Sequence, residues 1–508
     1  MALAPKTEST ETPNALPLWL GRLSFASLVA MAAAAPHSIA VSQGFWLLGI
    51  TLLAARLAVG PRPRMRISAI DGVLIAFVAW SVLSAVVSYE PAISLDKLRS
   101  IGLFLVFYLA RGAIASPRAA GIVIYVLIAS CMVNVIWTPL ERIVGRGVEV
   151  HGISPAGPLA RAGMLDGDTI LRVNGSRVVS PEELIAAIEG SPSAEVVYHR
   201  PDADKRFQIT ASDLAPGPAP LERLGIERWQ PNRVWRAKGF YGHFTTYSEV
   251  LQLIASLVLG LGLAGAAVWN RVRHRPNGTS ISPTLRIGVL AGALLLISVA
   301  LLLSGTRASQ LGLFVSGLVM VATLGSRKLI ILMLLAAIPV AILGYAVLQQ
   351  TRQQNETNEY RVTMWRDGVR LATESPRHLL VGVGMDSIKE RWREWGLFDD
   401  GRLPMGHFHS TPIQLAVERG LPALCLWLVF LALCAAALWR AARRIAPERY
   451  VSRGIIVGAL GALAGFFTSG LVHYNLGDGE VALVFYLILG TGLTVARMED
   501  GLTAADAA

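Results

Sequence analysis

The feature that most constrains this chain is the recurrence of apolar blocks about 20 residues long. A helix of that length crosses a bilayer, because each residue adds about 1.5 Å and the hydrocarbon core is about 30 Å thick. The 508 residues are 53% hydrophobic and only 16% charged, which is too apolar for an ordinary soluble domain. The pattern predicts an all-α polytopic membrane protein with about twelve transmembrane helices. We place them at roughly 17–35, 39–59, 70–89, 98–114, 119–139, 246–269, 286–304, 309–325, 329–348, 421–439, 454–473 and 479–496.

The charge of the short loops predicts how the chain is oriented. Cytoplasmic loops of membrane proteins are rich in Lys and Arg. The loops that fall on one side of the predicted spans are all basic: "PRPRMR" (61–66), "RGAIASPR" (111–118), "RVRHRP" (271–276), "SRK" (326–328) and "RAARRIAPERYVSR" (440–453). We therefore expect both termini in the cytoplasm. The net charge of +11 reflects these loops, so no nucleic-acid partner is expected.

Two long segments, 141–245 and 349–420, then fall on the outer side. Function concentrates on loops that a rigid scaffold positions, so these segments are the candidates for the functional site. We divide the chain accordingly into N-terminal spans, a small inserted domain, spans six to nine, an outer catalytic loop, and the last three spans with a cytoplasmic tail. The corresponding ranges are 1–140, 141–215, 216–348, 349–420 and 421–508.

The first outer segment contains a compact α/β module. "DTILRVNG" is typical of a strand that ends in an Asn-Gly turn, and "SPEELIAAI" begins with the N-cap signature of a helix, Ser180 followed by Pro181. The stretch "SPAGPLARAGMLDGDTILRVNG" resembles a bacterial PDZ domain of the kind found in periplasmic proteases. Such domains bind a peptide end as an added strand. The carboxylate-binding loop would then lie near "VGRGV" (144–148), although a purely structural insert is the alternative.

The second outer segment predicts an amphipathic helix, "RVTMWRDGVRLATESP", which Pro376 stops. Its Met364, Trp365 and Val369 are expected to lie on the membrane. A glycine-rich turn, "LVGVGMDS", opens a second helix, and "HFHSTPIQLAVERG" returns the chain to the membrane surface.

Arginines and histidines dominate the outer surface, and their chemistry suggests a reaction. Arginine matches pairs of phosphate oxygens and stays charged, and histidine takes a proton near neutral pH. This set suits glycosyl transfer from a lipid-diphosphate carrier, in which a base activates the acceptor hydroxyl and cations stabilise the leaving diphosphate. The predicted catalytic residues are His409, Arg307 and Arg361, and the predicted substrate-binding residues are Arg236, Arg366, Arg370, His407 and Glu418.

Each of these residues also has a structural alternative. Arg307 could cap a helical hairpin and snorkel, and His409 could be an ordinary interface histidine. No metal-binding spacing occurs on the outer side, and Cys131, Cys425 and Cys434 lie in apolar spans, so neither a metal nor another cofactor is expected.

The order of the motifs resembles that of the O-antigen ligase and O-antigen polymerase family. The stretches that carry the resemblance are "SGTRASQLGLFVSGL", "RVTMWRDGVRLATESPRHLLVGVGMDSI" and "HFHSTPIQLAVERGLPALCLWLVFL". The resemblance implies a glycosyltransferase C-type membrane fold and an undecaprenyl-diphosphate-linked glycan donor. It also implies a bacterial inner-membrane protein that transfers the glycan at the periplasmic face to an acceptor glycolipid or glycan. Ser410 stands where the family commonly has asparagine, and Pro412 follows closely. The PDZ-like insert is not a usual part of the family.

Two other classes of protein remain open. A membrane scaffold would recruit periplasmic proteins through the PDZ-like module. A secondary transporter would also fit twelve spans, but we detect neither a repeat of halves nor charged residues near the middle of the spans.

Overall fold

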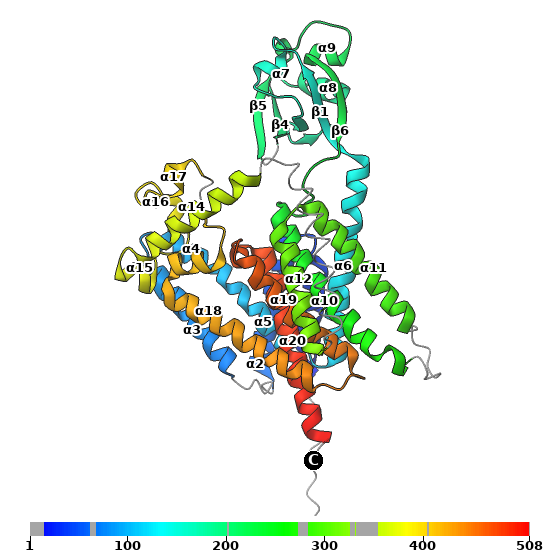
Figure 1. The fold of residues 1–508 in the computed structure, drawn as a ribbon, viewed down its shortest axis with the longest axis vertical. Helices are drawn as coiled ribbons and strands as arrows, with labels where there is room; N and C mark the ends of the chain where they lie inside the picture. Colours follow the sequence, from blue (N-terminus) through cyan, green and yellow to red (C-terminus); the bar gives the residue numbers. More distant parts are fainter. Residues whose placement is uncertain are drawn as a thin grey trace, which may run out of the picture. The chain divides into compact units, whose positions relative to one another are not determined.

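The computed structural model describes residues 15–60, 68–200, 203–272, 283–325, 331, 354–403 and 406–506. Its contacts divide into two compact units. The first unit, which we call the helical unit, combines Met1–Asn134 with Phe240–Ala508, and the second, the sheet unit, is Val135–Gly239. Figure 1 shows helices throughout the first and all the labelled strands in the second.

Ten helices of the described residues are long and apolar enough to cross a membrane. They are α1 (Ala15–Ala34), α2 (Ile39–Val59), α3 (Ala69–Val86), α6 (Pro117–Val144), α10 (Phe244–Val272), α11 (Pro283–Ser304), α12 (Arg307–Leu324), α18 (Thr411–Arg444), α19 (Tyr450–Gly470) and α20 (Gly479–Asp506). The protein is therefore a mostly helical, multi-pass membrane protein, as predicted.

The predicted number of about twelve spans exceeds these ten for two different reasons. The block 98–114 is helical but interrupted. It forms part of α4 (Pro91–Ile101), a 3₁₀ turn η1 (Gly102–Phe104) and α5 (Leu105–Ala113), so no single helix there reaches spanning length. The block 329–348 lies outside the described residues, apart from residue 331.

Small residues allow the central helices to pack backbone against backbone. A Cβ atom on Gly260 of α10 would lie 2.5 Å from the backbone nitrogen of Gly458 in α19, so only glycine fits there. On α12, Ser316 donates from Oγ to the carbonyl of Gly461 in α19, at 2.7 Å. Close approach and interhelical hydrogen bonds replace the hydrophobic effect as the cause of helix association in lipid. This packing fixes the start of α12, where Arg307 lies.

The segment before and into α18 forms a compact layer of short helices. These are α14 (Gln354–Thr373), α15 (Pro376–Val381), α16 (Ser387–Arg391) and α17 (Phe398–Gly401). Pro376 separates α14 from α15, as the sequence predicts, because Ser375 caps a new helix whose first residue is the proline. Met364 of α14 is buried in this layer's own core with Phe398 and Phe408, so its predicted membrane contact is wrong.

The glycine-rich turn after α15 holds this layer against α18. The backbone nitrogens of Val383 and Gly384 donate to the carbonyls of Val417 and Glu418, both at 2.9 Å. Helix α18 bends at Gly420, whose φ is +81°. A Cβ on Gly420 would lie 2.0 Å from the carbonyl oxygen of Leu380. The glycines are thus required by close contact and by positive φ.

The sheet unit is an antiparallel sheet in the order β5-β4-β2-β1-β6, with β3 paired to β2. The strands are β1 (Arg146–Ile153), β2 (Thr169–Val173), β3 (Ser176–Arg177), β4 (Ala194–Arg200), β5 (Ala203–Ile209) and β6 (Ile226–Asn232). Helices α7 (Pro158–Arg161), α8 (Pro181–Glu189) and α9 (Pro220–Leu224) accompany them. Ser180 accepts from the backbone of Glu183 and caps α8, as predicted.

The sheet extends beyond the predicted end of the inserted domain at residue 215, because β6 pairs with β1. The segment 144–148, where a peptide carboxylate was expected to bind, contributes to β1 instead. Arg146 pairs with Asn232 of β6, and Val148 pairs with Ile170 of β2. Strand β1 therefore has partners on both sides and leaves no open edge there.

Candidate functional site

Arg307 is the first residue of α12, directly after the tight turn that ends α11. Gly305 adopts a φ of +64°, and Thr306 is the N-cap. The side chain of Arg307 is exposed. Among the described residues its guanidinium has no hydrogen-bond or ion-pair partner. Because the N-terminus of a helix carries a partial positive charge, α12 adds to the attraction of Arg307 for an anion.

Arg361 of α14 lies close enough to Arg307 for the two charges to repel. Burial lowers the pKa of Arg361, and the positive charge of Arg307 lowers it further. Arg361 likewise has no hydrogen-bond or ion-pair partner among the residues that the structure describes. Two cations held together without an acidic partner among the described residues create a strong local preference for an anionic ligand.

His407 and His409 form a pair just before α18. Their ring centroids are 4.1 Å apart, and the backbone nitrogen of His409 donates to Nδ1 of His407 at 3.2 Å. Between them the fully buried Phe408 stacks on Phe398 and fixes the segment. His409 has a φ of +49°, an uncommon conformation for a residue other than glycine. Ser410 is the N-cap of α18 and Pro412 lies in its first turn, where proline is favoured.

The electrostatic environment keeps His409 neutral. Burial, followed by the positive charges of His407, Arg361 and His243, lowers the pKa of His409 to about 3. Its imidazole is therefore uncharged at neutral pH, and one ring nitrogen has a free lone pair. Burial and Lys389 also lower the pKa of His407, while Asp386 opposes them. We call Arg307, Arg361, His407 and His409 the arginine–histidine cluster.

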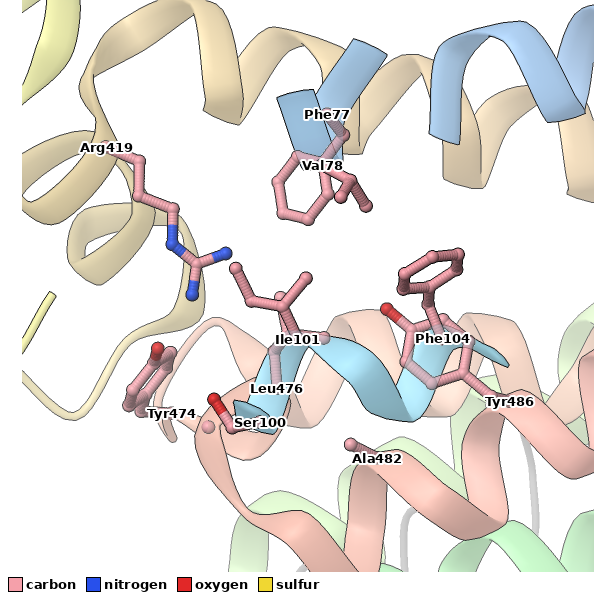
Figure 2. Close-up of a pocket in the computed structure, with 11 residues that line it drawn as sticks. Phe77, Val78, Ser100, Ile101, Phe104, Arg419, Tyr474, Leu476, Ala482 and Tyr486 are labelled. Atoms are coloured by element: carbon pink, nitrogen blue, oxygen red, sulfur yellow. The ribbon is translucent and has the colours of Figure 1, made fainter. Parts of the chain in front are cut away.

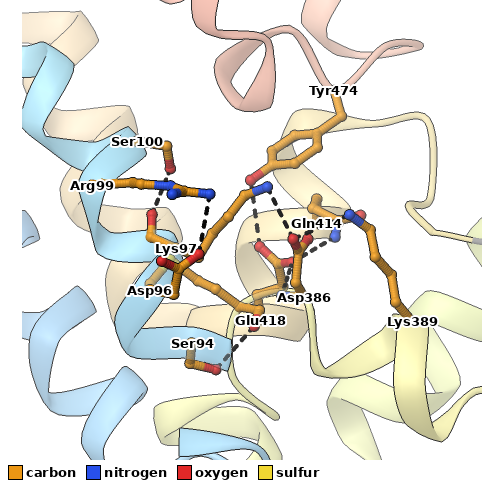
Figure 3. A network of polar contacts seen from close by, with 11 residues as sticks. Ser94, Asp96, Lys97, Arg99, Ser100, Asp386, Lys389, Gln414, Glu418 and Tyr474 are labelled. Atoms are coloured by element: carbon orange, nitrogen blue, oxygen red, sulfur yellow. Dashed lines mark hydrogen bonds and ion pairs between the residues drawn. The ribbon is translucent and has the colours of Figure 1, made fainter. Parts of the chain in front are cut away.

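Glu418 of α18 is buried and accepts hydrogen bonds from three other residues. Its Oε1 accepts from the backbone nitrogen of Asp386 and from Nε2 of Gln414, both at 2.9 Å. Its Oε2 accepts from the hydroxyl of Tyr474 at 3.4 Å. Figure 3 shows these contacts converging on the Glu418 carboxylate. Both of its oxygens are engaged within the protein, which favours a positioning role over direct substrate binding.

Asp386 extends the network toward α4. It forms ion pairs with Lys97 at 2.9 Å and with Lys389 at 3.1 Å (Figure 3). Burial alone would raise the pKa of Asp386, but the contacts with Lys97 and Lys389 lower it overall. The carboxylate is therefore charged at neutral pH and fixes the start of α16.

The other predicted binding residues divide between exposed and structural positions. Arg366 is exposed on α14 and has no partner among the described side chains and backbone groups. Arg370 donates to the carbonyls of Trp395 and Gly396, at 3.0 and 2.8 Å, so it closes the turn before α17. Arg236 is exposed in the sheet unit and so belongs to a different compact unit from the cluster.

His243 is a residue that sequence reasoning did not assign. It lies within the aromatic step "GFYGHF", directly before α10, and its Nδ1 accepts from the backbone nitrogen of Thr245 at 3.2 Å. Its charge contributes to the low pKa of both His407 and His409. The sequence signal that could have identified His243 is its position as a third histidine directly before a predicted span.

Comparison with known families identifies the region that contains the cluster. Residues 292–428 match the family described as O-antigen ligase. The chain carries an O-antigen ligase domain. The match confirms the predicted family for this region of the chain. The O-antigen ligase domain includes every predicted site residue except Arg236.

A second similarity covers a short stretch. Over 83 residues the chain is 38% identical to the magnetosome formation protease MamE of Magnetospirillum gryphiswaldense. This stretch is 16% of the chain and 10% of MamE, so the chain spans only a small part of that protein. Neither comparison addresses the roles of single residues in the O-antigen ligase domain, which remain predictions.

Proposed function

We propose that the protein is a glycosyltransferase that moves an undecaprenyl-diphosphate-linked glycan onto an acceptor hydroxyl, at the periplasmic face of the inner membrane. The observation that carries the proposal is the arginine–histidine cluster itself. Arg307 and Arg361 lie close together without an anionic partner among the described residues, beside the neutral His409. The O-antigen ligase domain that contains them supports the same class of reaction.

The proposed chemistry assigns one task to each side chain. His409 takes the proton of the acceptor hydroxyl as its oxygen attacks the sugar C1. The bond from C1 to the diphosphate oxygen breaks, and negative charge develops on the leaving lipid diphosphate. Arg307 and Arg361 stabilise that charge, because each offers a fork of donors to phosphate oxygens. His407 and Glu418 hold the cluster in position. These steps need no metal ion.

The test is complementation of cells that lack the gene. They receive the wild type, Arg307→Ala, His409→Ala or the control Arg440→Ala, and their lipopolysaccharide and secreted polysaccharide are separated by size. Arg440 is exposed at the far end of α18, and its Nε bonds only to a carbonyl of its own helix. We expect the control to restore wild-type glycans, and we expect the two cluster variants to be produced in the membrane without restoring them.

The glycan that the cluster variants fail to make shows which acceptor the protein uses. Loss of long-chain lipopolysaccharide with accumulation of full-length carrier-linked glycan would indicate a ligase. Products limited to a single repeat would indicate a polymerase. Normal glycans in both cluster variants would contradict the proposed function and favour the scaffold.

We infer further that the sheet unit is a PDZ-like module. Its antiparallel sheet with a capped helix supports this inference. A peptide partner has weaker support, because 144–148 contributes to an interior strand. A pull-down with the sheet unit deleted would test the scaffold alternative, which requires that periplasmic partners are lost with the unit.

A further inference from the structure

Glu249 of α10 is a buried acid that has no basic partner among the described residues. It lies in the part of α10 that is apolar enough to cross a membrane, and it is only 2% exposed. Its Oε1 has no hydrogen-bond partner, and no ion pair involves its carboxyl group in the described part of the chain. Helices α11, α12, α19 and α20 pack against α10. Of their charged groups, the one that acts on Glu249 is Asp478, directly before α20, and a second acid repels a negative charge.

Other buried charges of the helical unit show what such a group requires. Glu499 of α20 is 5% exposed and forms an ion pair with Arg449. Arg419 of α18 is 4% exposed, and its guanidinium interacts electrostatically with Glu418. The same guanidinium lies 5.5 Å from the ring centroid of Phe77, which Figure 2 draws beside it. An unpaired charge in such surroundings is strongly unfavourable, so a buried acid without a base keeps its proton.

Gln252, one turn further along α10, has a buried oxygen that also needs a donor. The side chain is 1% exposed, and its Oε1 has no hydrogen-bond partner among the described residues. Its Nε2 donates to the hydroxyls of Ser256 and Ser316, both at 3.2 Å. The hydroxyl of Ser256 itself donates to the carbonyl of Gln252, at 2.8 Å. That of Ser316 donates to the carbonyl of Gly461, at 2.7 Å. Each hydroxyl has used its one proton and can only accept from the amide, which leaves Oε1 to find a donor elsewhere.

The two oxygens belong to neighbouring side chains. Residues three apart lie on the same face of a helix, so Glu249 and Gln252 are adjacent on α10. The amide is tightly enclosed, since a Cβ on Gly465 of α19 would lie 2.0 Å from Nε2 of Gln252. One added hydrogen atom therefore satisfies both oxygens at once and removes the buried charge.

We propose that Glu249 is a proton-binding site inside the membrane part of the protein, in which the neutral carboxylic acid donates a hydrogen bond to Oε1 of Gln252. A proton is the ligand that this position suits best, because it needs no cavity. Ionisable side chains inside a membrane are rare and costly, and they are typical of functional sites. The inference does not rest on the proposed function, because proton binding requires no transfer reaction.

The site lies next to a contact that positions α12. The hydroxyl of Ser248, the residue before Glu249, lies 3.1 Å from that of Ser309 on α12. Ser309 comes two residues after Arg307. Loss of the proton would place an unpaired negative charge beside this contact between the two helices. Occupancy of the site therefore favours the packing of α10 on α12.

The test measures the carbonyl stretch of protonated carboxylic acids by infrared spectroscopy. The sample is the purified full-length protein at neutral pH, in a detergent without ester groups. Ionised carboxylates do not give this band, so the difference between wild type and Glu249→Gln isolates one residue. We expect the band of one carboxylic acid to be lost in Glu249→Gln, and to shift in Gln252→Leu, which removes the acceptor. Glu499→Gln is the matched control, because it makes the same replacement at a buried acid that is ion-paired, and it should remove no band.

The ionic composition of the sample distinguishes a proton from a metal cation. The band should be the same in sodium chloride and in choline chloride. Its loss on addition of sodium would mean that a sodium ion occupies the site in place of the proton, and would overturn the proposal. If Glu249→Gln does not fold, Glu249→Asp keeps an acid with a shorter side chain, and the band should shift. Spectra of Glu249→Gln, or of Glu249→Asp in its place, that equal the wild-type spectrum would also overturn the proposal.

Discussion

At the scale of single residues, the repulsion between Arg307 and Arg361 is expected to lower the stability of the fold, while the same two charges serve the proposed activity. An ordinary ion pair stabilises the fold, and its loss is destabilising. Here each guanidinium disfavours the other, since the positive charge of Arg307 lowers the pKa of Arg361 and no described acid compensates. Residues arranged in this way are typical of sites that await a ligand, because function and stability place opposite demands on them.

Arg361→Ala is therefore expected to lower transfer without lowering stability. We expect the rate to fall about 10²- to 10³-fold, the usual cost of losing one group that stabilises developing negative charge. The melting temperature should stay the same or rise slightly, because the repulsion of Arg307 is removed. Rates in membranes and thermal unfolding of the purified protein check both, with Arg440→Ala as the control. A large drop in melting temperature would instead assign Arg361 a structural role.

His409 should give an unusual pH dependence. A histidine base with an ordinary pKa of about 6.5 loses activity as the pH falls through that value. The pKa of His409 is lowered to about 3, so its imidazole stays neutral down to far lower pH. We expect kcat/KM, which reports the free enzyme, to show no acidic limb due to this residue between pH 8 and 5. A decline centred near 6.5 that disappears in His409→Gln would contradict this environment.

At the scale of elements, the bend of α18 connects the O-antigen ligase domain's short helices to its membrane helix. Gly420→Ala would place a Cβ 2.0 Å from the carbonyl oxygen of Leu380, at a φ of +81°. We expect a loss of about 1–3 kcal/mol in the free energy of unfolding from backbone strain alone, and reduced transfer through displacement of Glu418. The matched control is Gly292→Ala in α11, where a Cβ would meet nothing within 4 Å. Equal melting temperatures for the two variants would refute this role for the bend.

Arg370 gives a test of the division between structural and substrate-binding arginines. Its bonds to the carbonyls of Trp395 and Gly396 close the turn before α17. Arg370→Met should increase proteolytic cleavage near residues 395–396 and reduce transfer far less than Arg361→Ala does. The cleavage products are identified by mass spectrometry. A loss of transfer as large as that of Arg361→Ala, without added cleavage, would restore Arg370 to the binding residues.

The sequence predicts some elements much better than others, for physical reasons. Ten of the predicted spans are found because twenty apolar residues in lipid have few alternatives to a helix. The interruption at Gly102–Phe104 is not visible in hydropathy, which measures composition and not local hydrogen bonding. Strand β6 was missed because it pairs with β1, about 80 residues earlier, and only this long-range pairing makes it a strand.

The candidate site shows the same contrast between local signals and long-range contacts. The sequence singles out Arg307 and His409 as candidates because they stand at the ends of apolar blocks. The role of Glu418 was not, because its partners Asp386 and Tyr474 come from other elements. His243 was missed for the same reason, since its effect on His409 arises only after the helices have assembled.

At the scale of the whole molecule, the sheet unit should fold by itself. It has its own buried core, which includes Val150, Leu184 and Ile226. We expect residues 135–239 to unfold cooperatively when expressed alone. Residues 135–215, which lack β6, should be much less stable, because β1 loses one of its two neighbours. Circular dichroism during heating compares the two fragments. Equal stability would support the shorter boundary predicted from the sequence.

The contacts that hold the glycine-rich turn also constrain the order in which the protein assembles during its synthesis. Ser84 of α3 bonds to carbonyls 297 and 334 residues further along the chain, and Trp80 bonds to one 339 residues away. These polar groups enter the membrane while the ribosome still has more than half of the polypeptide to make. Until residue 419 has been synthesised, these donors lack the partners that they have in the folded protein. The glycine-rich turn and the start of α18 can therefore take their final positions against α3 only after most of the chain has been made.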